Sequence, residues 1–162
     1  METLDPIISE DVDRILDSTD ECIRELAGST VLIAGAGGFL GSYVLDTIVA
    51  ANRTRIQKTP ATVLALSRRP PDKSTRFHHL LQDAHVRFIT ADITKSLDVA
   101  GGIDYIIHAA SPASPKAWAA HPIETADANT VGVRNLLELA VASRVRGFVI
   151  VSSGHVYGDA GE

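Results

Sequence analysis

The strongest constraint on the fold is an apolar run of β-branched residues that leads into a glycine-rich turn and then a helix. Thr30–Ala34 is the apolar run, and Phe39–Ala51 carries aliphatic residues at helical spacing. A second, longer helix is predicted over 123–143. Four later runs have strand-like character: 62–66, 86–89, 104–108 and 147–152. Because strands that alternate with helices pair in parallel through right-handed crossovers, the sequence predicts an α/β fold with a five-stranded, doubly wound parallel sheet.

The first 28 residues differ in character from the rest. They hold nine acidic and two basic residues, a net charge of −7, whereas the whole chain carries −5. With Ser9 as N-cap and Gly28 as the stop, an apolar stripe predicts one amphipathic helix: Val12, Ile15, Leu16, Thr19, Ile23 and Leu26. We expect an acidic helical extension at 1–28 and a ligand-binding domain at 29–162. The stripe favours an arm packed on that domain, and a partner-binding helix is the alternative.

Composition argues against several classes of function. The net charge of −5 disfavours a broadly basic nucleic-acid surface, and no run approaches the roughly 18 consecutive apolar residues of a membrane span. The acidic N-terminus lacks the basic start of a secretory signal. The single cysteine, Cys22, fits a reducing compartment, so we expect a cytoplasmic protein. The six histidines show no metal-ligand spacing, and we expect no metal site.

The turn after the first strand has the chemistry of a phosphate-binding loop. Gly35 permits a tight turn, Gly38 removes a side chain where a diphosphate approaches the backbone, and Gly41 lets the helix pack closely. The amides at the helix start, at Phe39 and Leu40, and the helix dipole would hold the phosphates. The strand–turn–helix context that the motif requires is present, so we expect a dinucleotide site rather than a glycine turn without a ligand.

The glycine spacing is G-x-x-G-x-x-G. With its flanking segments it resembles the short-chain dehydrogenase/reductase superfamily, and more narrowly the extended branch of NAD-dependent epimerases and dehydratases that modify nucleotide sugars. The resemblance covers about residues 30–160. It implies a Rossmann-like fold that binds NAD or NADP, transient hydride transfer to this cofactor, and a nucleotide sugar as substrate.

Within that branch, the run Ser111–Pro115 and the residues after it are similar to UDP-glucuronate decarboxylases, and the overall pattern resembles dTDP-glucose 4,6-dehydratases. Both kinds of enzyme carry acidic residues in the stretch where Gly154 and His155 stand here. The resemblance therefore leaves the reaction open between epimerase, dehydratase, decarboxylase and reductase.

The resemblance also implies roles for individual residues. Asp92 would hydrogen-bond the adenine amino group, with Ile93 packed on the ring, and Asn129 matches an asparagine of the family. Small residues after the fourth strand would let the ribose lie against the backbone: Ala109, Ala110 and Ser111. Ser152 would lie beside the nicotinamide, and Ser153 matches the catalytic position whose hydroxyl hydrogen-bonds the substrate oxygen. From the residues alone, Asp92 is also a strand-end cap, Asn129 a polar helix residue and Ser153 a solvated strand end.

The end of the second strand bears on the choice of cofactor. An acidic residue there usually binds the 2′-hydroxyl of the NAD ribose. Here Ser67 stands at that position and is followed by Arg68 and Arg69. Guanidinium groups pair well with a 2′-phosphate, so the sequence favours NADP, with Arg68 as the binding residue. The alternative is that both arginines belong to a solvated loop.

The family's proton-transfer pair is missing. In Tyr-x-x-x-Lys both side chains share one helix face, and the lysine lowers the tyrosine pKa. Four positions after Tyr43, Tyr105 and Tyr157 stand threonine, alanine and glycine. We expect the N-terminal part of a longer enzyme, truncated before that pair and the substrate domain, inactive alone and homodimeric when complete. The alternatives are a non-catalytic dinucleotide-binding regulatory module and a reductase of small carbonyl compounds.

Overall fold

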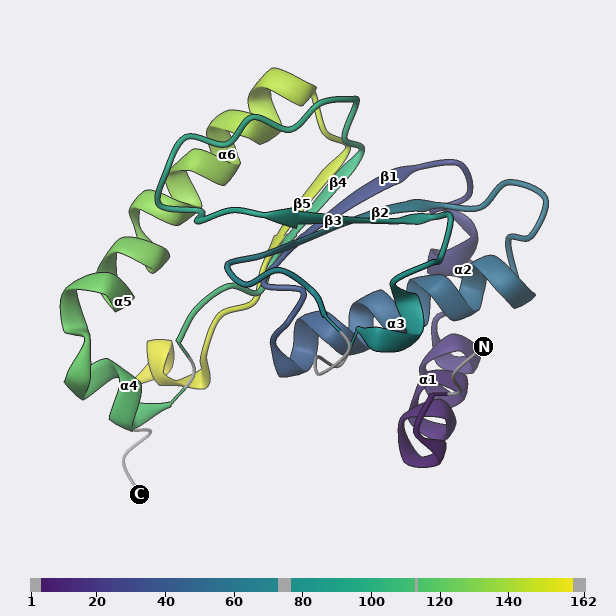
Figure 1. Cartoon of the computed structure of the whole chain (residues 1–162), viewed down its shortest axis with the longest axis horizontal. Coiled ribbons are helices and arrows are strands. Elements are labelled where there is room, and N and C mark those ends of the chain that lie inside the picture. The colour runs from purple at the N-terminus through teal and green to yellow at the C-terminus, as the bar shows by residue number, and fades with distance from the viewer. Residues whose placement is uncertain (1–3, 73–76, 113, 159–162) are drawn as a thin grey trace.

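The computed structural model describes residues 4–72, 77–112 and 114–158, whose arrangement is shown in Figure 1. Residues 159–162 of the predicted domain lie outside this description. Five parallel strands form one sheet in the order β3-β2-β1-β4-β5, which confirms the predicted α/β class. The strands are β1 (Thr30–Ala34), β2 (Thr62–Ser67), β3 (Val86–Thr90), β4 (Tyr105–His108) and β5 (Gly147–Ile150).

The strand order reverses at the centre of the sheet. β1 pairs with β2 on one side and with β4 on the other, so that Ala34 lies opposite both Leu66 and His108. β1 and β2 are almost wholly buried, which explains why both read as continuous apolar runs instead of alternating ones. The reversal between β1 and β4 creates the switch point outside which open α/β sheets bind ligands.

Helices cover both faces of the sheet. In Figure 1, α3 (Phe39–Thr54) lies on one face with α1 (Pro6–Ser18) beyond it, and α6 (Val131–Ser143) lies on the other. Each face has its own buried apolar cluster, one containing Leu45 of α3 and the other Leu136 of α6. Shorter elements complete the described chain: α2 (Asp20–Arg24), η1 (His78–Leu80), α4 (Pro115–Ala120), α5 (Pro122–Asn129) and η2 (Gly154–Tyr157).

The prediction of a single helix from Ser9 to Gly28 is wrong. Helix α1 begins earlier, because the Asp5 side chain accepts a hydrogen bond from the Ile7 amide (2.9 Å) and proline occupies the first turn. The helix breaks at Thr19, whose backbone leaves helical geometry and whose hydroxyl donates to the Ile15 carbonyl (2.7 Å). Gly28 does adopt a left-handed conformation (φ +72°), but it lies four residues beyond α2.

Helix α1 packs against α3, as the arm interpretation predicts. Val12 and Leu16 are buried in the same cluster as the inner face of α3. At the edge of this contact the Tyr43 hydroxyl donates to Asp11 (2.9 Å). Arg55, at the end of α3, pairs with aspartates of the extension, among them Asp17 at 2.7 Å. The acidic residues facing α3 therefore have partners on that helix, and the extension shares the core of the domain.

The single helix predicted over 123–143 is also wrong. The chain forms α5 and α6 with a break at Thr130, where the backbone (φ −119°, ψ −69°) departs from helical geometry. At this break the Thr130 hydroxyl donates to the carbonyl of Ala126 (2.7 Å). Asn129 accordingly ends α5 instead of lying inside a helix. No helix within the described ranges is long and apolar enough to cross a bilayer.

Candidate functional site

The candidate residues gather at one edge of the sheet. The glycine-rich turn follows β1, Arg68 follows β2, Asp92 lies just after β3 and Ala109 follows β4. Because all five strands are parallel, these segments leave the sheet at the same, carboxyl edge. The structure thus brings together residues up to 74 positions apart in the sequence, and it places them at the switch point.

Two glycines of the turn are required by the fold itself. Gly35 has a φ of +85°, a left-handed conformation that favours glycine, and a Cβ there would lie 2.6 Å from the Ala109 carbonyl oxygen and 2.7 Å from the Ala110 Cα. A Cβ on Gly41 would lie 2.2 Å from the Gly35 carbonyl oxygen. These contacts bring the turn directly against the backbone that follows β4.

Gly38 has a different environment. It is the N-cap of α3 with a φ of −79°, and among the described residues a Cβ there would contact only the Gly35 carbonyl oxygen, at 3.2 Å. The first amides of the helix, at Phe39 and Leu40, have no carbonyl partner within the helix. Their side chains are 73% and 52% exposed. The turn therefore presents backbone donors at a helix N-terminus beside exposed residues, an arrangement suited to a diphosphate.

The end of β4 forms the wall beside this turn. The Ala109 amide donates to the Ala34 carbonyl (2.8 Å), and the Val151 amide donates to the His108 carbonyl (2.9 Å). His108 is 3% exposed, and burial lowers the pKa of its imidazole, so the ring is neutral near pH 7. Its Nδ1 accepts a hydrogen bond from the Ala110 amide (3.3 Å). The buried ring thereby fixes the small residues against which Gly35 packs.

Asp92 caps the end of β3. One carboxylate oxygen accepts hydrogen bonds from the Thr94 amide (2.9 Å) and the Thr94 hydroxyl (2.8 Å). These two hydrogen bonds hold the pKa of Asp92 below its usual value, and the positive charge of Arg68 lowers it further. The strand-end interpretation is confirmed, and the contact with adenine stays a prediction. The Ala91 amide donates to the Ser67 carbonyl (3.1 Å), so the residues that follow them, Arg68 and Asp92, leave adjacent strands at the same corner of the sheet.

Ile93 and the loop around it are held by helix α6. Ile93 is 4% exposed, and a Cβ on Gly132 would lie only 2.6 Å from its Cδ1. The Asn135 side chain of α6 donates to the backbone carbonyls of Ile93 (2.8 Å) and Lys95 (3.1 Å). Asn135 was not identified from the sequence, where its only signal is a place in the same run as Asn129. It fixes the loop that carries Asp92.

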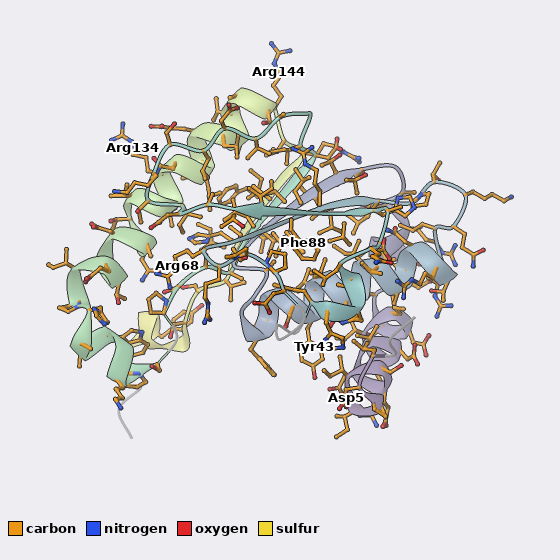
Figure 2. All side chains as sticks on the ribbon, viewed as in Figure 1. Asp5, Tyr43, Arg68, Phe88, Arg134 and Arg144 are labelled. Carbon is orange, nitrogen blue, oxygen red and sulfur yellow. The ribbon has the colours of Figure 1, made fainter. Side chains whose placement is uncertain are left out.

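The remaining predicted residues are exposed. Arg68 is exposed, and in Figure 2 it lies on the side of the sheet where α4 and α5 are found. Ser111 follows β4, and Ser152 and Ser153 follow β5, at the same carboxyl edge as the glycine turn. Asn129 instead lines a shallow apolar hollow of about 660 Å³ on the outer surface of α6. The structure therefore groups the serines with the turn and places Asn129 in a hollow shared with α6.

None of the three tyrosines, all within the described residues, lies in the setting of a Tyr-x-x-x-Lys pair. Tyr43 bonds to the N-terminal helix, the Tyr105 ring lies 5.1 Å from the Arg146 guanidinium, and Tyr157 in η2 is 88% exposed. Within the described ranges no group of three or more His, Cys, Asp or Glu residues could hold a metal ion.

Comparison with protein-family models matches residues 31–162 to the NAD dependent epimerase/dehydratase family. The chain belongs to this family. The match begins at the second residue of β1 and covers the glycine turn and every later element. The resemblance that we inferred from the glycine spacing and the strand ends is therefore confirmed, and with it membership of a family of NAD-dependent enzymes.

Among individual proteins, the chain is similar to UDP-glucuronic acid decarboxylases. UDP-glucuronic acid decarboxylase 1 of Danio rerio is 30% identical over 129 residues, which are 80% of this chain and 28% of that protein. UDP-glucuronic acid decarboxylase 2 of Arabidopsis thaliana is 29% identical over 132 residues, 82% of this chain and 27% of that protein. This chain thus spans little more than a quarter of the length of these decarboxylases.

Solved structures agree on the fold. The structure of a dTDP-glucose 4,6-dehydratase from Streptomyces venezuelae with NAD bound has a TM-score of 0.67 at 24% identity, over 82% of this chain and 42% of that one. A UDP-galactose 4-epimerase matches with a TM-score of 0.65 at 25% identity, over 82% of this chain and 41% of that one. The Rossmann-like fold is confirmed.

Proposed function

We propose that this chain forms the cofactor-binding part of an oxidoreductase that modifies a nucleotide sugar by transient hydride transfer. The observation that carries the proposal is the glycine turn, where Gly35 contacts Ala109 and Ala110 and Gly38 caps the N-terminus of α3 without a side chain. When bound, the nicotinamide ring supplies the hydride acceptor. The names of the relatives, UDP-glucuronic acid decarboxylases, support a nucleotide sugar as the substrate.

Within this proposal the amides of the turn bind the diphosphate, and Asp92 binds the adenine. The small residues after β4 accommodate the ribose, and Ser152 lies beside the nicotinamide. Ser153 hydrogen-bonds the substrate oxygen that gains or loses a proton. Several residues complete the proposed set: Phe39, Leu40, Gly41, Ile93, Ala109, Ala110, Ser111 and Asn129.

We also propose that the cofactor is NADP. No carboxylate stands at the end of β2, where Ser67 and two arginines follow one another, and Arg68 is exposed near Asp92. A guanidinium at that corner suits a 2′-phosphate better than a ribose hydroxyl. Tighter binding of NADP than of NAD by the chain would support the proposal, and the reverse would contradict it.

Turnover requires groups that these 162 residues do not contain, because no tyrosine has a lysine four positions later. We propose that the chain binds dinucleotide without catalysing the reaction alone. The same absence favours a second candidate function for the chain as it stands, a non-catalytic dinucleotide-binding module. Measurable turnover of a nucleotide sugar by the purified chain would contradict both.

Two further proposals concern assembly and location. Helix α6 has an exposed apolar face that includes Leu137 (44% exposed) and Val141 (79% exposed), which supports pairing with a second copy of the chain. The exposed, unpaired thiol of Cys22 supports a reducing compartment such as the cytoplasm.

The decisive test is calorimetric titration of the chain with NAD and NADP. Gly38→Ala adds a methyl group that the fold tolerates better than at Gly35 or Gly41, but which occupies the approach to the amides. We expect binding at least about tenfold weaker, because charge-assisted hydrogen bonds to the diphosphate lengthen or break. Gly102→Ala is the matched control, since Gly102 is exposed with no atom of the described residues near a Cβ there. If Gly38→Ala bound NAD and NADP as tightly as the wild type, the proposal would be contradicted.

A further inference from the structure

The segment just before β3 reaches back to the glycine turn. Phe77, directly before η1, is 4% exposed. A Cβ on Gly37 would lie 3.5 Å from the Phe77 ring and 3.8 Å from the Ser67 Cβ. The aromatic ring therefore lies at the place where the turn meets the end of β2. These are the two segments that the proposed function assigns to the diphosphate and to the 2′-phosphate.

A buried pair holds this segment on α3. The His79 Nε2 lies 2.8 Å from the Asp46 Oδ1, and the two side chains are 8% and 3% exposed. A carboxylate buried to this degree is costly to leave without hydrogen-bond donors, so the contact constrains both elements strongly. Asp46 belongs to the helix whose first turn presents the phosphate-binding amides. The pair therefore ties η1 to the body of the helix that starts at the glycine turn.

Other contacts also hold the segment. The Arg53 guanidinium of α3 lies 2.7 Å from the carboxylate of Asp83, three residues after η1. The Phe77 and Phe88 rings lie 5.3 Å apart, and Leu80 is 1% exposed in the cluster shared with α3. Between β2 and β3, the described residues form only the short turn η1, whereas β1 and β2 are joined by the long helix α3. The position of Phe77 thus depends on packing and on polar contacts with α3. His79 lies within η1, and its pair with Asp46 is more deeply buried than the Arg53–Asp83 pair, so it constrains η1 more closely.

We propose that His79 and Asp46 are positioning residues for the ribose end of the dinucleotide site. By holding η1 on α3 they keep Phe77 against Gly37 and Ser67, and so set the spacing between the diphosphate turn and the 2′-substituent near the end of β2. Neither side chain touches the ligand, and both act through the Phe77 ring. The inference rests on the proposed function and deepens it, because it concerns how the site distinguishes NADP from NAD.

The test is the ratio of the Kd for NAD to the Kd for NADP, measured by titration of the full chain. We expect His79→Leu, which removes the contact with Asp46, to reduce this ratio by about threefold or more. His79→Gln retains a donor for Asp46 and should recover most of the wild-type ratio. Phe77→Leu keeps an apolar side chain but shortens it, and should reduce the ratio as His79→Leu does. Arg24→Gln, which breaks an exposed pair with Asp20 in α2, is the control.

The outcomes separate the two proposals. Failure of the wild-type chain to bind either dinucleotide would overturn the proposed function itself. If the wild type binds and the variants keep their circular dichroism spectrum, an unchanged ratio in His79→Leu shows a merely structural pair and overturns this inference alone. If His79→Leu weakens the binding of NAD and of NADP by the same factor, the ratio is unchanged and the inference is likewise overturned. If His79→Leu does not fold, an unchanged ratio in Phe77→Leu overturns the inference.

Discussion

Single residues at the carboxyl edge of the sheet differ in how strictly the fold requires them. Gly35 and Gly41 are required because a Cβ would overlap backbone atoms, and Gly38 is the member of the motif whose absence of a side chain the packing explains least. The motif reads as one unit in the sequence, but its glycines have separate physical reasons. Their contributions can therefore be measured separately.

Three glycine-to-alanine variants separate backbone strain from steric overlap. Gly102→Ala should change the free energy of unfolding by less than about 0.5 kcal/mol. In Gly28→Ala the added Cβ has no atom within 4 Å, but the residue keeps a φ of +72°. The strain should lower the free energy of unfolding by about 1 kcal/mol. Gly35→Ala adds overlap with the backbone after β4, and should cost about 3 kcal/mol or more. Urea unfolding measures all three, and equal costs for Gly28→Ala and Gly35→Ala would contradict the contact with Ala109.

The buried imidazole of His108 should make stability depend on pH. Burial lowers its pKa below 6.5, so between 6.5 and the folded-state value the unfolded chain binds a proton that the folded chain excludes. The free energy of unfolding therefore falls as pH is lowered through this window. His108→Gln should show a smaller fall between about pH 7 and about pH 5 in urea unfolding. The control is His121→Gln, at a histidine whose side chain is 67% exposed. Its free energy of unfolding should fall over this pH range as much as that of the wild type.

Among the elements, α3 joins the glycine turn, the sheet and the N-terminal extension. Its N-terminus forms the glycine turn, its inner face packs on β1 and β2, and its outer surface receives α1 and η1. The label for Tyr43 in Figure 2 marks the place where α3 meets the N-terminal helix. Through Tyr43 and Arg55 the acidic extension becomes part of the domain, even though the charge pattern separates the two in the sequence.

If the extension shares the core, weakening it should weaken the whole domain. Leu16 is 2% exposed in the cluster that includes α3, so Leu16→Ala should lower the free energy of unfolding by about 3 kcal/mol. Urea unfolding followed by circular dichroism should still show one transition. Ile7→Ala, at a position 71% exposed on the same helix, should change stability by less than about 0.5 kcal/mol. A separate early transition for the arm would show that it folds independently.

At the scale of the whole molecule, the helices on the two faces of the sheet differ in how far they are covered. On one side α3 is covered in part by α1, whereas on the other side α6 exposes valine and leucine side chains. An apolar surface of this kind usually marks an interface, and this supports the proposed pairing of two copies.

Self-association through α6 can be tested with one exposed residue. Val141→Lys places a charge at a position 79% exposed, so it should leave the fold intact but prevent burial of that face. Sedimentation equilibrium should show a dimer for the wild type and a mass shifted towards the monomer for the variant. Ile7→Lys, also at an exposed apolar position, is the control and should remain dimeric. A monomeric wild type would contradict the proposal.

Most of the sheet was predictable because its signals are local. The β-branched run at Thr30–Ala34 and the glycine turn need no distant contact to be recognised, and β1 agrees with its prediction residue for residue. The helix boundaries were predicted less well, because the helices break at Thr19 and Thr130 although the apolar periodicity continues across both positions. Thr47 makes the same kind of hydrogen bond, to the Tyr43 carbonyl (2.8 Å), without interrupting α3, so a local hydroxyl bond does not by itself decide where a helix ends.

The order of apolar runs, the glycine spacing and the motifs at the strand ends were sufficient to predict the fold class and the family. The tertiary structure alone decided that Gly35 rests on Ala109, that Asn135 holds the loop of Asp92, and that His79 pairs with Asp46. The physical reason is range: periodicity and turn chemistry act over a few residues, whereas these contacts join segments separated by tens of residues. Such contacts exist only once the sheet has set the distance between its strand ends.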